Sequence, residues 1–381
     1  MQTAPFPLGS NSQPRILVLS MRDLEFHISR SYISEFENCI CSFDDVDLFK
    51  LPYVNKNFTE KVVNNVARKI FQISSSNQIF NLFNERYSLK KQYDLFLFIC
   101  QEPIDLLYLS ALKDWRSRCS KAVCLLEEVW LENFAKEQKQ LSVLKEFDYV
   151  FMNLSSSIKA VANTIQTPCI YMPCGVDAVE FCPYPLQPQR SIDVCNFGRS
   201  PPTVHQSLLN LGEKENFLYM YDTIKDLFTK NHQEHRTLYQ NIVKRSKYFI
   251  GYGAKFNLKG EVGVQQELGS RFFEGTSGGA VILGTPPQTE TFTQNFDWSD
   301  AVIELPSDAT NAAEVIADLN LQSERLKEVR KNNVVNSLLR HDWVYRWGQI
   351  LDRVGLNHTP KMAQRRAYLQ SLADMAIQKS S

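Results

Sequence analysis

The chain has 381 residues, which exceeds the size of one average domain and predicts two. Lysine plus arginine and aspartate plus glutamate both number 42, so no overall charge favours nucleic acid or an anionic membrane surface as a partner. Hydrophobic residues make up 44% and charged residues 22%, a globular mixture that can bury two cores.

The nine cysteines show neither a CxxC pair nor the spacing of zinc ligands. Several of them lie in apolar segments, so we interpret them as small buried side chains in a reducing compartment. No cationic–apolar signal segment and no run of 18 apolar residues occurs. We therefore expect a cytoplasmic protein without an integral membrane segment.

The first half of the chain alternates apolar strands with helices, which predicts a parallel α/β sheet. Strands are expected at 15–20, 93–100, 121–126 and 149–152, and helices at 24–39, 58–86, 104–118 and 131–146. The first strand is followed by Met-Arg-Asp-Leu, which lacks the glycines of a dinucleotide-binding turn. This half is therefore not expected to hold a pyrophosphate.

An acidic pair, Glu127 and Glu128, ends one of these strands and is followed by Trp130. Ligands of open α/β sheets collect beyond the carboxyl ends of the strands, and two adjacent carboxylates raise the pKa of at least one of them. The pair is a candidate catalytic base, or one glutamate caps the next helix at its positive end. The competing base is His27, which follows the first strand.

Asp45 and Asp47 form an Asp-x-Asp tripeptide near the first helix. Two carboxylates at this spacing can hold a divalent ion against a sugar-nucleotide pyrophosphate. The tripeptide is common by chance, so solvated acidic residues at a strand end are the preferred interpretation.

Glycine is concentrated in the second half: nine glycines lie from Gly251 to Gly284, whereas only Gly9 precedes residue 175. Such a concentration lets the backbone approach a ligand closely, often a phosphate. Residues 267–284 predict a helix, an end at two consecutive glycines and a short buried strand. Arg271 and Glu274 are three apart on one helix face, and the fold alone does not require them.

These residues resemble the nucleotide-binding half of a GT-B glycosyltransferase that uses a sugar nucleotide. In that family a helix carries Glu-Gly-Phe-Gly and a second glutamate eight positions after the first. Gly269 falls on the second glycine and Glu274 on the second glutamate, while Gln266, with Glu267 beside it, takes the place of the first glutamate. The variant Arg-Phe-Phe-Glu followed by Gly-Gly-Ala is similar to the spore-maturation-protein-like branch of these transferases.

A second point of resemblance is Gly198-Arg199, which follows a strand predicted at 191–197. In the family, an arginine at this strand end contacts the donor diphosphate, and a lysine usually follows about five residues later. His205 ends the segment that replaces this lysine. The second cation is therefore expected to be Arg271, Lys255 or His205, or to be absent.

The resemblance implies the GT-B architecture, in which two Rossmann-like domains face each other across a cleft. The family's first domain ends with Pro-x-Gly-Val-Asp and Phe-x-Pro, which match 173–177 and 181–183. We expect an acceptor domain at 1–182 and a nucleotide-sugar donor domain at 190–358. A C-terminal helix at 360–381 is expected to cross back onto the first domain.

The function implied is that of a hexosyltransferase-like glycosyltransferase in glycan biosynthesis, acting on an unidentified glycan, lipid, small-molecule or protein acceptor. No cofactor and no metal is expected, and the related branches imply retention of configuration. The implied donor contacts are Arg199 with Arg271 or Lys255 at the diphosphate, Glu274 at the ribose hydroxyls and Gln266 or Glu267 at the sugar.

Two alternatives remain open. One is a metal-dependent, GT-A-like transferase that uses Asp45 and Asp47. The other is a non-catalytic GT-B-like protein that binds a nucleotide sugar or serves in assembly, because the usual lysine and the first glutamate are both replaced.

Overall fold

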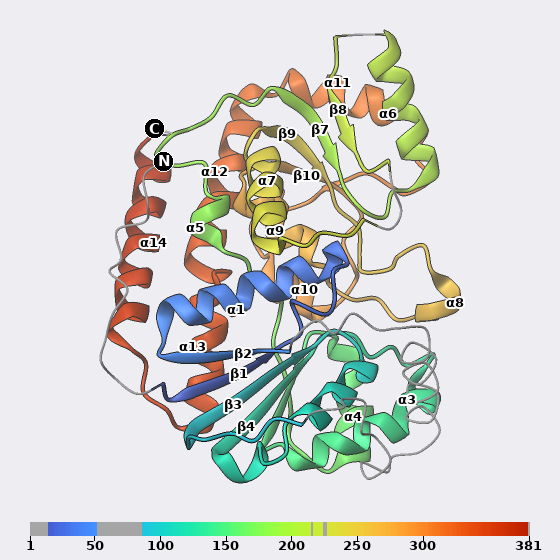
Figure 1. Cartoon of the computed structure of the whole chain (residues 1–381). Helices are drawn as coiled ribbons and strands as arrows, with labels where there is room; N and C mark the ends of the chain where they lie inside the picture. Colours follow the sequence, from blue (N-terminus) through green and yellow to red (C-terminus); the bar gives the residue numbers. More distant parts are fainter. Residues whose placement is uncertain (1–13, 52–85, 215, 224–226, 380–381) are drawn as a thin grey trace.

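The computed structural model describes residues 14–51, 86–214, 216–223 and 227–379, and these residues form two parallel β-sheets with helices on their faces (Figure 1). The helix expected at 58–86 falls almost entirely outside the described residues. Two separate sheets confirm the predicted α/β class with two Rossmann-like units.

The first sheet has six strands in the order β2-β1-β3-β4-β5-β6, all paired in parallel. Its strands are β1 (Ile16–Ser20), β2 (Val46–Lys50), β3 (Tyr93–Cys100), β4 (Cys119–Leu126), β5 (Tyr149–Met152) and β6 (Cys169–Tyr171). Successive residues of β1 belong to different cores: Ile16 and Val18 face one, Leu17 and Leu19 the other. Burial on both faces explains why these strands are continuous apolar runs.

The second sheet has five parallel strands in the order β11-β10-β9-β7-β8. They are β7 (Ile192–Asn196), β8 (Tyr219–Tyr221), β9 (Ser246–Ile250), β10 (Val281–Gly284) and β11 (Ile303–Glu304). Phe249 of β9 packs in one core and its neighbours Tyr248 and Ile250 pack in another, so helices cover both faces here too.

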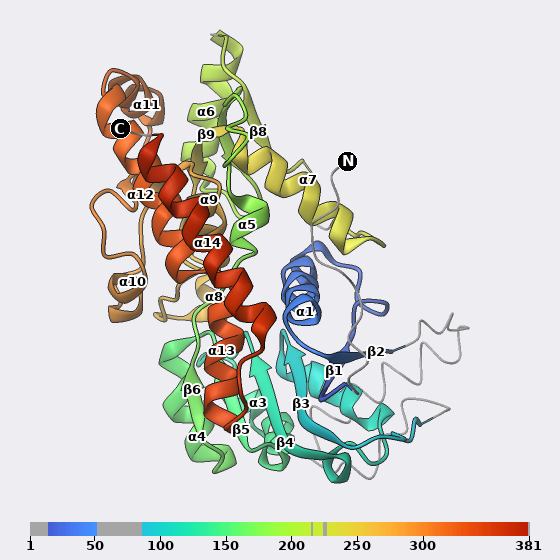
Figure 2. The same ribbon diagram turned by 90° about the vertical axis from the view of Figure 1, so that its left-hand side faces the viewer.

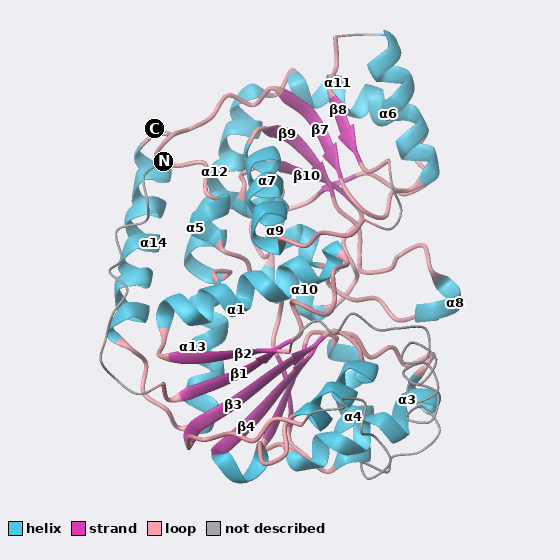
Figure 3. Ribbon diagram, viewed as in Figure 1, coloured by secondary structure: helices cyan, strands magenta, loops and turns pink. Residues whose placement is uncertain are grey.

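Helices connect the strands and cover both sheets (Figure 3). The α-helices of the first unit and the linker are α1 (Ser31–Phe43), α3 (Phe134–Leu141), α4 (Ile158–Ile165) and α5 (Ala178–Phe181). Those of the second unit are α6 (Pro202–Lys214), α7 (His232–Lys244), α8 (Lys259–Val262), α9 (Ser270–Ser277), α10 (Glu290–Asn295), α11 (Ala312–Asn320) and α12 (Ser323–Arg340). The last two are α13 (Trp343–Val354) and α14 (Pro360–Gln378).

Several expected helices are shorter or of another type. The segment expected as a helix at 104–118 forms two 3-10 segments, η3 (Pro103–Ala111) and η4 (Arg116–Arg118). Three further 3-10 segments are η1 (Ile28–Arg30), η5 (Ser142–Glu146) and η6 (Ser155–Ser157). Local periodicity does not distinguish these short 3-10 segments from α-helix.

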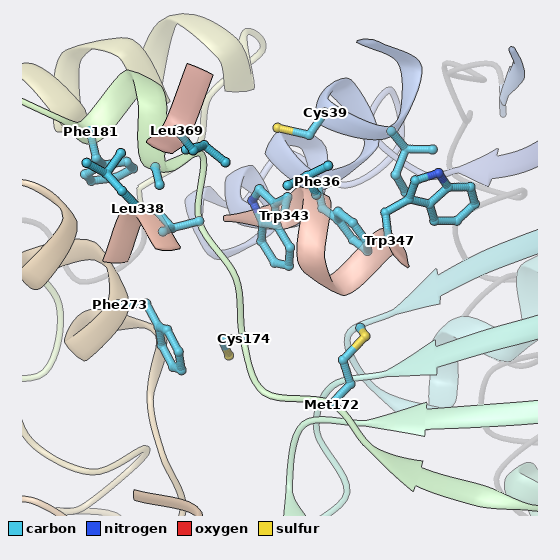
Figure 4. Packing of buried hydrophobic residues seen from close by; sticks show 14 of the residues in the cluster. Phe36, Cys39, Met172, Cys174, Phe181, Phe273, Leu338, Trp343, Trp347 and Leu369 are labelled. Carbon is cyan, nitrogen blue, oxygen red and sulfur yellow. The ribbon is translucent and has the colours of Figure 1, made fainter. Parts of the chain in front are cut away.

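The C-terminal helices return to the first unit, as predicted, and they do so before residue 360. Trp343 of α13 stacks on Phe36 of α1, with ring centroids 4.3 Å apart, and the Trp347 indole donates to Asp44. Helix α14 then runs along α12 and also contacts α1 (Figure 2). Figure 4 shows these side chains in the apolar cluster that joins the two units, with Phe273 and Leu338.

No helix in the described part of the chain combines the length and apolarity needed to cross a bilayer.

Candidate functional site in the cleft between the two sheets

The carboxyl edges of the two sheets face each other. Lys255, which follows β9, forms an ion pair with Glu128, which follows β4, at 2.8 Å. Strand order reverses at β1 in the first sheet and at β7 in the second. Ligands of open α/β sheets bind at such switch points beyond the strand ends. The segments that carry the predicted site residues therefore meet at the expected place.

Two arginines lie together at the end of β7. Gly198 has a φ of +81°, and a Cβ on it would lie 1.7 Å from the Arg271 guanidinium, so only glycine lets Arg271 pass this close. Arg271 donates from Nε to the Phe197 carbonyl at 2.7 Å, and the Gly198 amide donates to Asp222. Partial burial and the Arg271 charge lower the pKa of Arg199.

Neither arginine has a carboxylate within ion-pair distance in the described part of the chain. Glu128 and Glu261 act on Arg199, and Asp222 is influenced by Arg271, so these carboxylates offset part of the positive charge. Two adjacent guanidinium groups still repel each other and attract an anion. The charge of Arg199 and Arg271 at this strand end is therefore compatible with a bound diphosphate. Their role in donor binding stays a prediction.

Lys255 lies across the cleft from the first unit in a strained conformation. Its φ is +50°, in the left-handed region that side chains other than glycine and asparagine rarely adopt. Its ammonium pairs with Glu128 at 2.8 Å and Glu261 at 3.1 Å and lies 5.6 Å from the Trp130 ring centroid. Burial opposes the charged form, but Glu128 and Glu261 together raise the pKa of Lys255.

The adjacent glutamates occupy different environments. Glu128 faces the cleft, where it accepts from Lys255 and from the Trp130 indole at 3.2 Å. Glu127 is 7% exposed, and burial, followed by the Glu128 charge, raises its pKa well above the ordinary value. The nearby Tyr32 hydroxyl opposes this rise. The expectation that adjacency raises one of the two pKa values is met in direction, with burial as the larger cause.

His27 lies at the contact between the two units, and Ser29 links it to Gln101, whose backbone carbonyl accepts from the Glu128 amide. His27 caps η1 by accepting from the Ser29 amide, and its ring packs edge-on against Phe228 with centroids 5.5 Å apart. Backbone bonds join the same segments, since the Ile28 amide donates to the Leu227 carbonyl at 3.0 Å. These contacts give His27 a place in the junction, and its catalytic role stays a prediction.

The residues aligned with the family's first glutamate differ in accessibility. Gln266 is exposed and accepts from the Gln288 amide at 2.9 Å. Glu267 is 1% exposed and accepts from the Ser155 and Ser156 amides, both at 3.0 Å. It thereby caps η6 of the first unit, so of the two only Gln266 is open to a donor sugar. Gly269 begins α9.

The environment of Glu274 differs from the sequence interpretation, in which the fold alone does not require this residue. It is 6% exposed, and its carboxylate accepts from Arg236 at 2.6 Å and from the Tyr239 hydroxyl at 3.1 Å. Arg236 also donates to Glu35 of α1 at 2.8 Å. Glu274 is therefore one end of a buried Glu–Arg–Glu network between the two units. A ribose contact, which stays a prediction, would compete with these bonds.

The structure contradicts the GT-A-like alternative. Asp45 and Asp47 lie at the amino-terminal end of β2, the edge opposite the cleft, and Asp47 accepts from Tyr93 at 2.7 Å and Lys91 at 2.9 Å. The acidic residues do lie at a strand end. Because β2 pairs in parallel with β1, that end belongs to the edge of the sheet that faces away from the cleft. Within the described ranges, no three His, Cys, Asp or Glu side chains form a metal-binding group.

A cavity of about 530 Å³ lies between the two units, with Gln266 in its wall. The first unit contributes Leu131, Glu132 and Ser156, and the second contributes Val262, Val264, Gln265, Gln266, Gln288 and Thr289. Its size suits a small ligand, and its amides and hydroxyls suit a sugar or another polar group. Sequence reasoning missed Glu132, Gln288 and Thr289, for which no local pattern was available.

Comparisons with known proteins extend the description. No protein-family model matches the chain, and no curated protein matches it. Among solved structures, the chain is similar to an alpha,alpha-trehalose-phosphate synthase (UDP-forming) from Burkholderia vietnamiensis, with a TM-score of 0.55 and 8% identity over 93% of this chain and 99% of that one. It is also similar to S. aureus MnaA in a co-structure with UDP, with a TM-score of 0.44 and 9% identity over 90% of this chain and 97% of that one.

A third similar structure is TarM, with a TM-score of 0.43 and 10% identity over 68% of this chain. The chain spans about half of TarM, 54% of its length. The match to the synthase runs through nearly the whole of both chains. Together with the two parallel sheets and their facing carboxyl edges, it shows that this chain has the GT-B fold of two Rossmann-like domains.

Proposed function

We propose that the protein transfers a sugar from a nucleotide-sugar donor to an acceptor hydroxyl in the cleft between its two sheets. The observation that carries the proposal is the pair of guanidinium groups, Arg199 and Arg271, that lack an ion-pair partner in the described residues and lie at the switch point of the second sheet. Lys255 supplies a third cation on the adjoining strand end. This charge suits the diphosphate of a nucleotide sugar.

In the proposed reaction, the bond between the sugar's anomeric carbon and the diphosphate oxygen breaks, and the nucleoside diphosphate leaves with the electron pair. Arg199 and Arg271 stabilise the negative charge that builds on it, so that neither a metal nor another cofactor is needed. The acceptor oxygen bonds to the anomeric carbon and gives up its proton.

The first unit supplies the base for that proton in this scheme. Glu127 has a raised pKa, which makes its carboxylate a stronger base than an ordinary glutamate. Glu128 lies nearer the cations because it already pairs with Lys255. We assign the base to this pair and place the acceptor on the first domain, residues 1–182, with the donor on residues 190–358.

A non-catalytic role is the second candidate, and specific contacts favour it. Glu274 and Glu267, two of the predicted donor contacts, are held in buried hydrogen bonds within the protein. A protein that only binds a nucleotide sugar needs the cations but no base.

Isothermal titration calorimetry with UDP, GDP and TDP, followed by turnover assays with their sugars, tests the proposal. We expect one nucleoside diphosphate to bind the native protein and the Arg325→Gln control, and to bind Arg199→Ala more weakly. Arg325 is a matched control because its ion pair with Asp300 is remote from the cleft. Turnover that persists with chelator supports the metal-independent scheme. Binding without turnover over a broad acceptor panel favours the non-catalytic role, and no binding at all refutes both.

A further inference from the structure

A second cavity, which unlike the first is lined by cationic side chains, lies at the opposite edge of the second sheet from the cleft. It has a volume of about 250 Å³ and is formed where the linker between the sheets, α12 and the end of α14 meet. Its wall consists of Pro183, Tyr184, Gln187, Pro188, Arg190, Lys327, Arg330, Lys331, Val334 and Lys379. Five of these ten residues are lysine or arginine, and none is acidic.

The position of Arg190 places the cavity at the amino-terminal edge of the sheet. Arg190 lies two residues before the first residue of β7. It donates to the Ser246 carbonyl at the start of β9 at 2.6 Å and to the Gly278 carbonyl shortly before β10 at 2.9 Å. The Arg199 site lies at the carboxyl edge, beyond the other end of β7. The two sites are therefore separated by the length of the sheet.

The charges of Arg190 and Arg330 are uncompensated within the described residues. Arg190 uses its hydrogen bonds on carbonyl oxygens, and the buried Nε of Arg330 has no hydrogen-bond partner there. Burial, followed by the Arg330 charge, lowers the pKa of Arg190 to about 9. No carboxylate contributes to either pKa. Both arginines are half-buried, and like charges without an opposite charge are unfavourable there, so a bound anion would stabilise them.

The lysines supply flexible charge around these two arginines. Lys327 is exposed on α12, Lys331 pairs with Glu328 outside the cavity wall at 2.5 Å, and Lys379 donates to the Pro185 carbonyl at 3.4 Å. A fixed arginine with mobile lysines is the usual donor set for a phosphate, because arginine binds two oxygens in a defined geometry and lysine adds point charge. The volume admits a phosphate with a small substituent.

We propose that this cavity, lined by Arg190, Lys327, Arg330, Lys331 and Lys379, is a phosphate-binding site for inorganic phosphate or a small phosphate monoester, separate from the cleft. The bound phosphate neutralises the arginine pair. Because the linker, α12 and α14 all line the site, binding holds these three segments together. The proposal does not depend on sugar transfer in the cleft.

The test is thermal unfolding and calorimetry of the full chain with inorganic phosphate and, separately, with glycerol phosphate, against chloride at matched ionic strength. At about 10 mM phosphate we expect a rise in the melting temperature of the native protein and of the Lys145→Gln control. Arg330→Gln and Lys327→Gln are expected to lose most of that rise and to bind at least about tenfold more weakly. Lys145 is an exposed lysine outside the cavity wall.

Arg330→Gln removes a half-buried charge that acts on Arg190, so we expect it to be at least as stable as the native protein in chloride. Lys327→Gln is exposed and serves as the second variant. A stronger response to glycerol phosphate than to phosphate identifies a monoester as the ligand, and the reverse identifies the free ion. No saturable binding of either probe, or a phosphate effect that survives in both variants and is lost in Arg199→Ala, overturns the proposal.

Discussion

Neutralising Glu274 tests whether this residue holds the two units together. Glu274→Gln keeps the shape of the side chain but removes the charge that Arg236 pairs with at 2.6 Å. The side chains of Arg236 and Glu274 are only 6% and 8% exposed, so solvent screens this pair weakly. The substitution leaves Arg236 with a single carboxylate, Glu35.

The structure sets the size of the effect. For charge centres about 4 Å apart and an effective dielectric constant of about 20, the lost attraction is about 4 kcal/mol. Loss of one partner of a buried ion pair costs about 3–5 kcal/mol, and the remaining bond to Glu35 favours the lower end, about 3 kcal/mol. A unit of about 150–250 residues melts about 2–4 °C lower per kcal/mol, so the melting temperature is expected to fall by about 6–12 °C.

Differential scanning fluorimetry measures the fall, with Glu328→Gln as the control. Glu328 also pairs with a cation on a helix, Lys331, but its side chain is 57% exposed, so we expect a change within about 2 °C. Calorimetry with the nucleoside diphosphate is run in parallel at a temperature well below melting. An unchanged melting temperature together with lost nucleotide affinity would refute the structural reasoning and would support the ribose contact instead.

Three further changes address the cleft. Arg199→Ala is expected to lower kcat/KM by a factor of about 10² to 10³ and to weaken binding of the nucleoside diphosphate more than that of the nucleoside, whereas equal losses would make Arg199 structural. Lys255→Met is expected to weaken donor binding about tenfold in calorimetry, and unchanged affinity would leave Lys255 only its pairing with Glu128. Burial raises the pKa of Glu127 above 4.5, so native turnover is expected to rise with pH, with a midpoint above 4.5. Glu127→Gln is expected to lose this rise. If the rise persists in the variant, Glu127 is not the base. The same raised pKa makes the contribution of Glu127 to folding stability fall as pH rises from about 4.5 toward the folded value, and Glu127→Gln is expected to abolish that fall in urea unfolding.

The local pattern of the chain was sufficient for much of the fold. The apolar runs at Tyr93–Cys100 and Cys119–Leu126 are buried on both faces, and such runs are typical of parallel strands. Gly279, one of the two glycines expected to end α9, has a φ of +67°. Apolar residues recur at helical spacing around Trp343 and Trp347, a pattern that predicts a core-facing helix side, and both tryptophans are buried. These features depend on near neighbours in the sequence.

Part of the candidate site was also predictable, because the position of a residue after a strand predicts which edge of the sheet it occupies. In a parallel sheet the residues after each strand gather at one edge, so Glu128, Arg199 and Lys255 could be expected to converge. The ion pair between Lys255 and Glu128 agrees with that expectation. Gly198, which has no side chain, leaves room for the Arg271 guanidinium, a contact that the sequence did not predict.

Only the tertiary structure decided which charged groups remain available. Glu274 and Arg271 stand three residues apart on one helix, yet Glu274 meets Arg236 from another helix and Arg271 meets no carboxylate in the described residues. Glu267 is held by amides of the first unit more than a hundred residues away. Such pairings depend on how the two units dock, and a single sequence contains no periodic signal for partners that distant. The sequence by itself determined the two sheets and the strand ends that face the cleft; docking determined which carboxylates the fold itself uses.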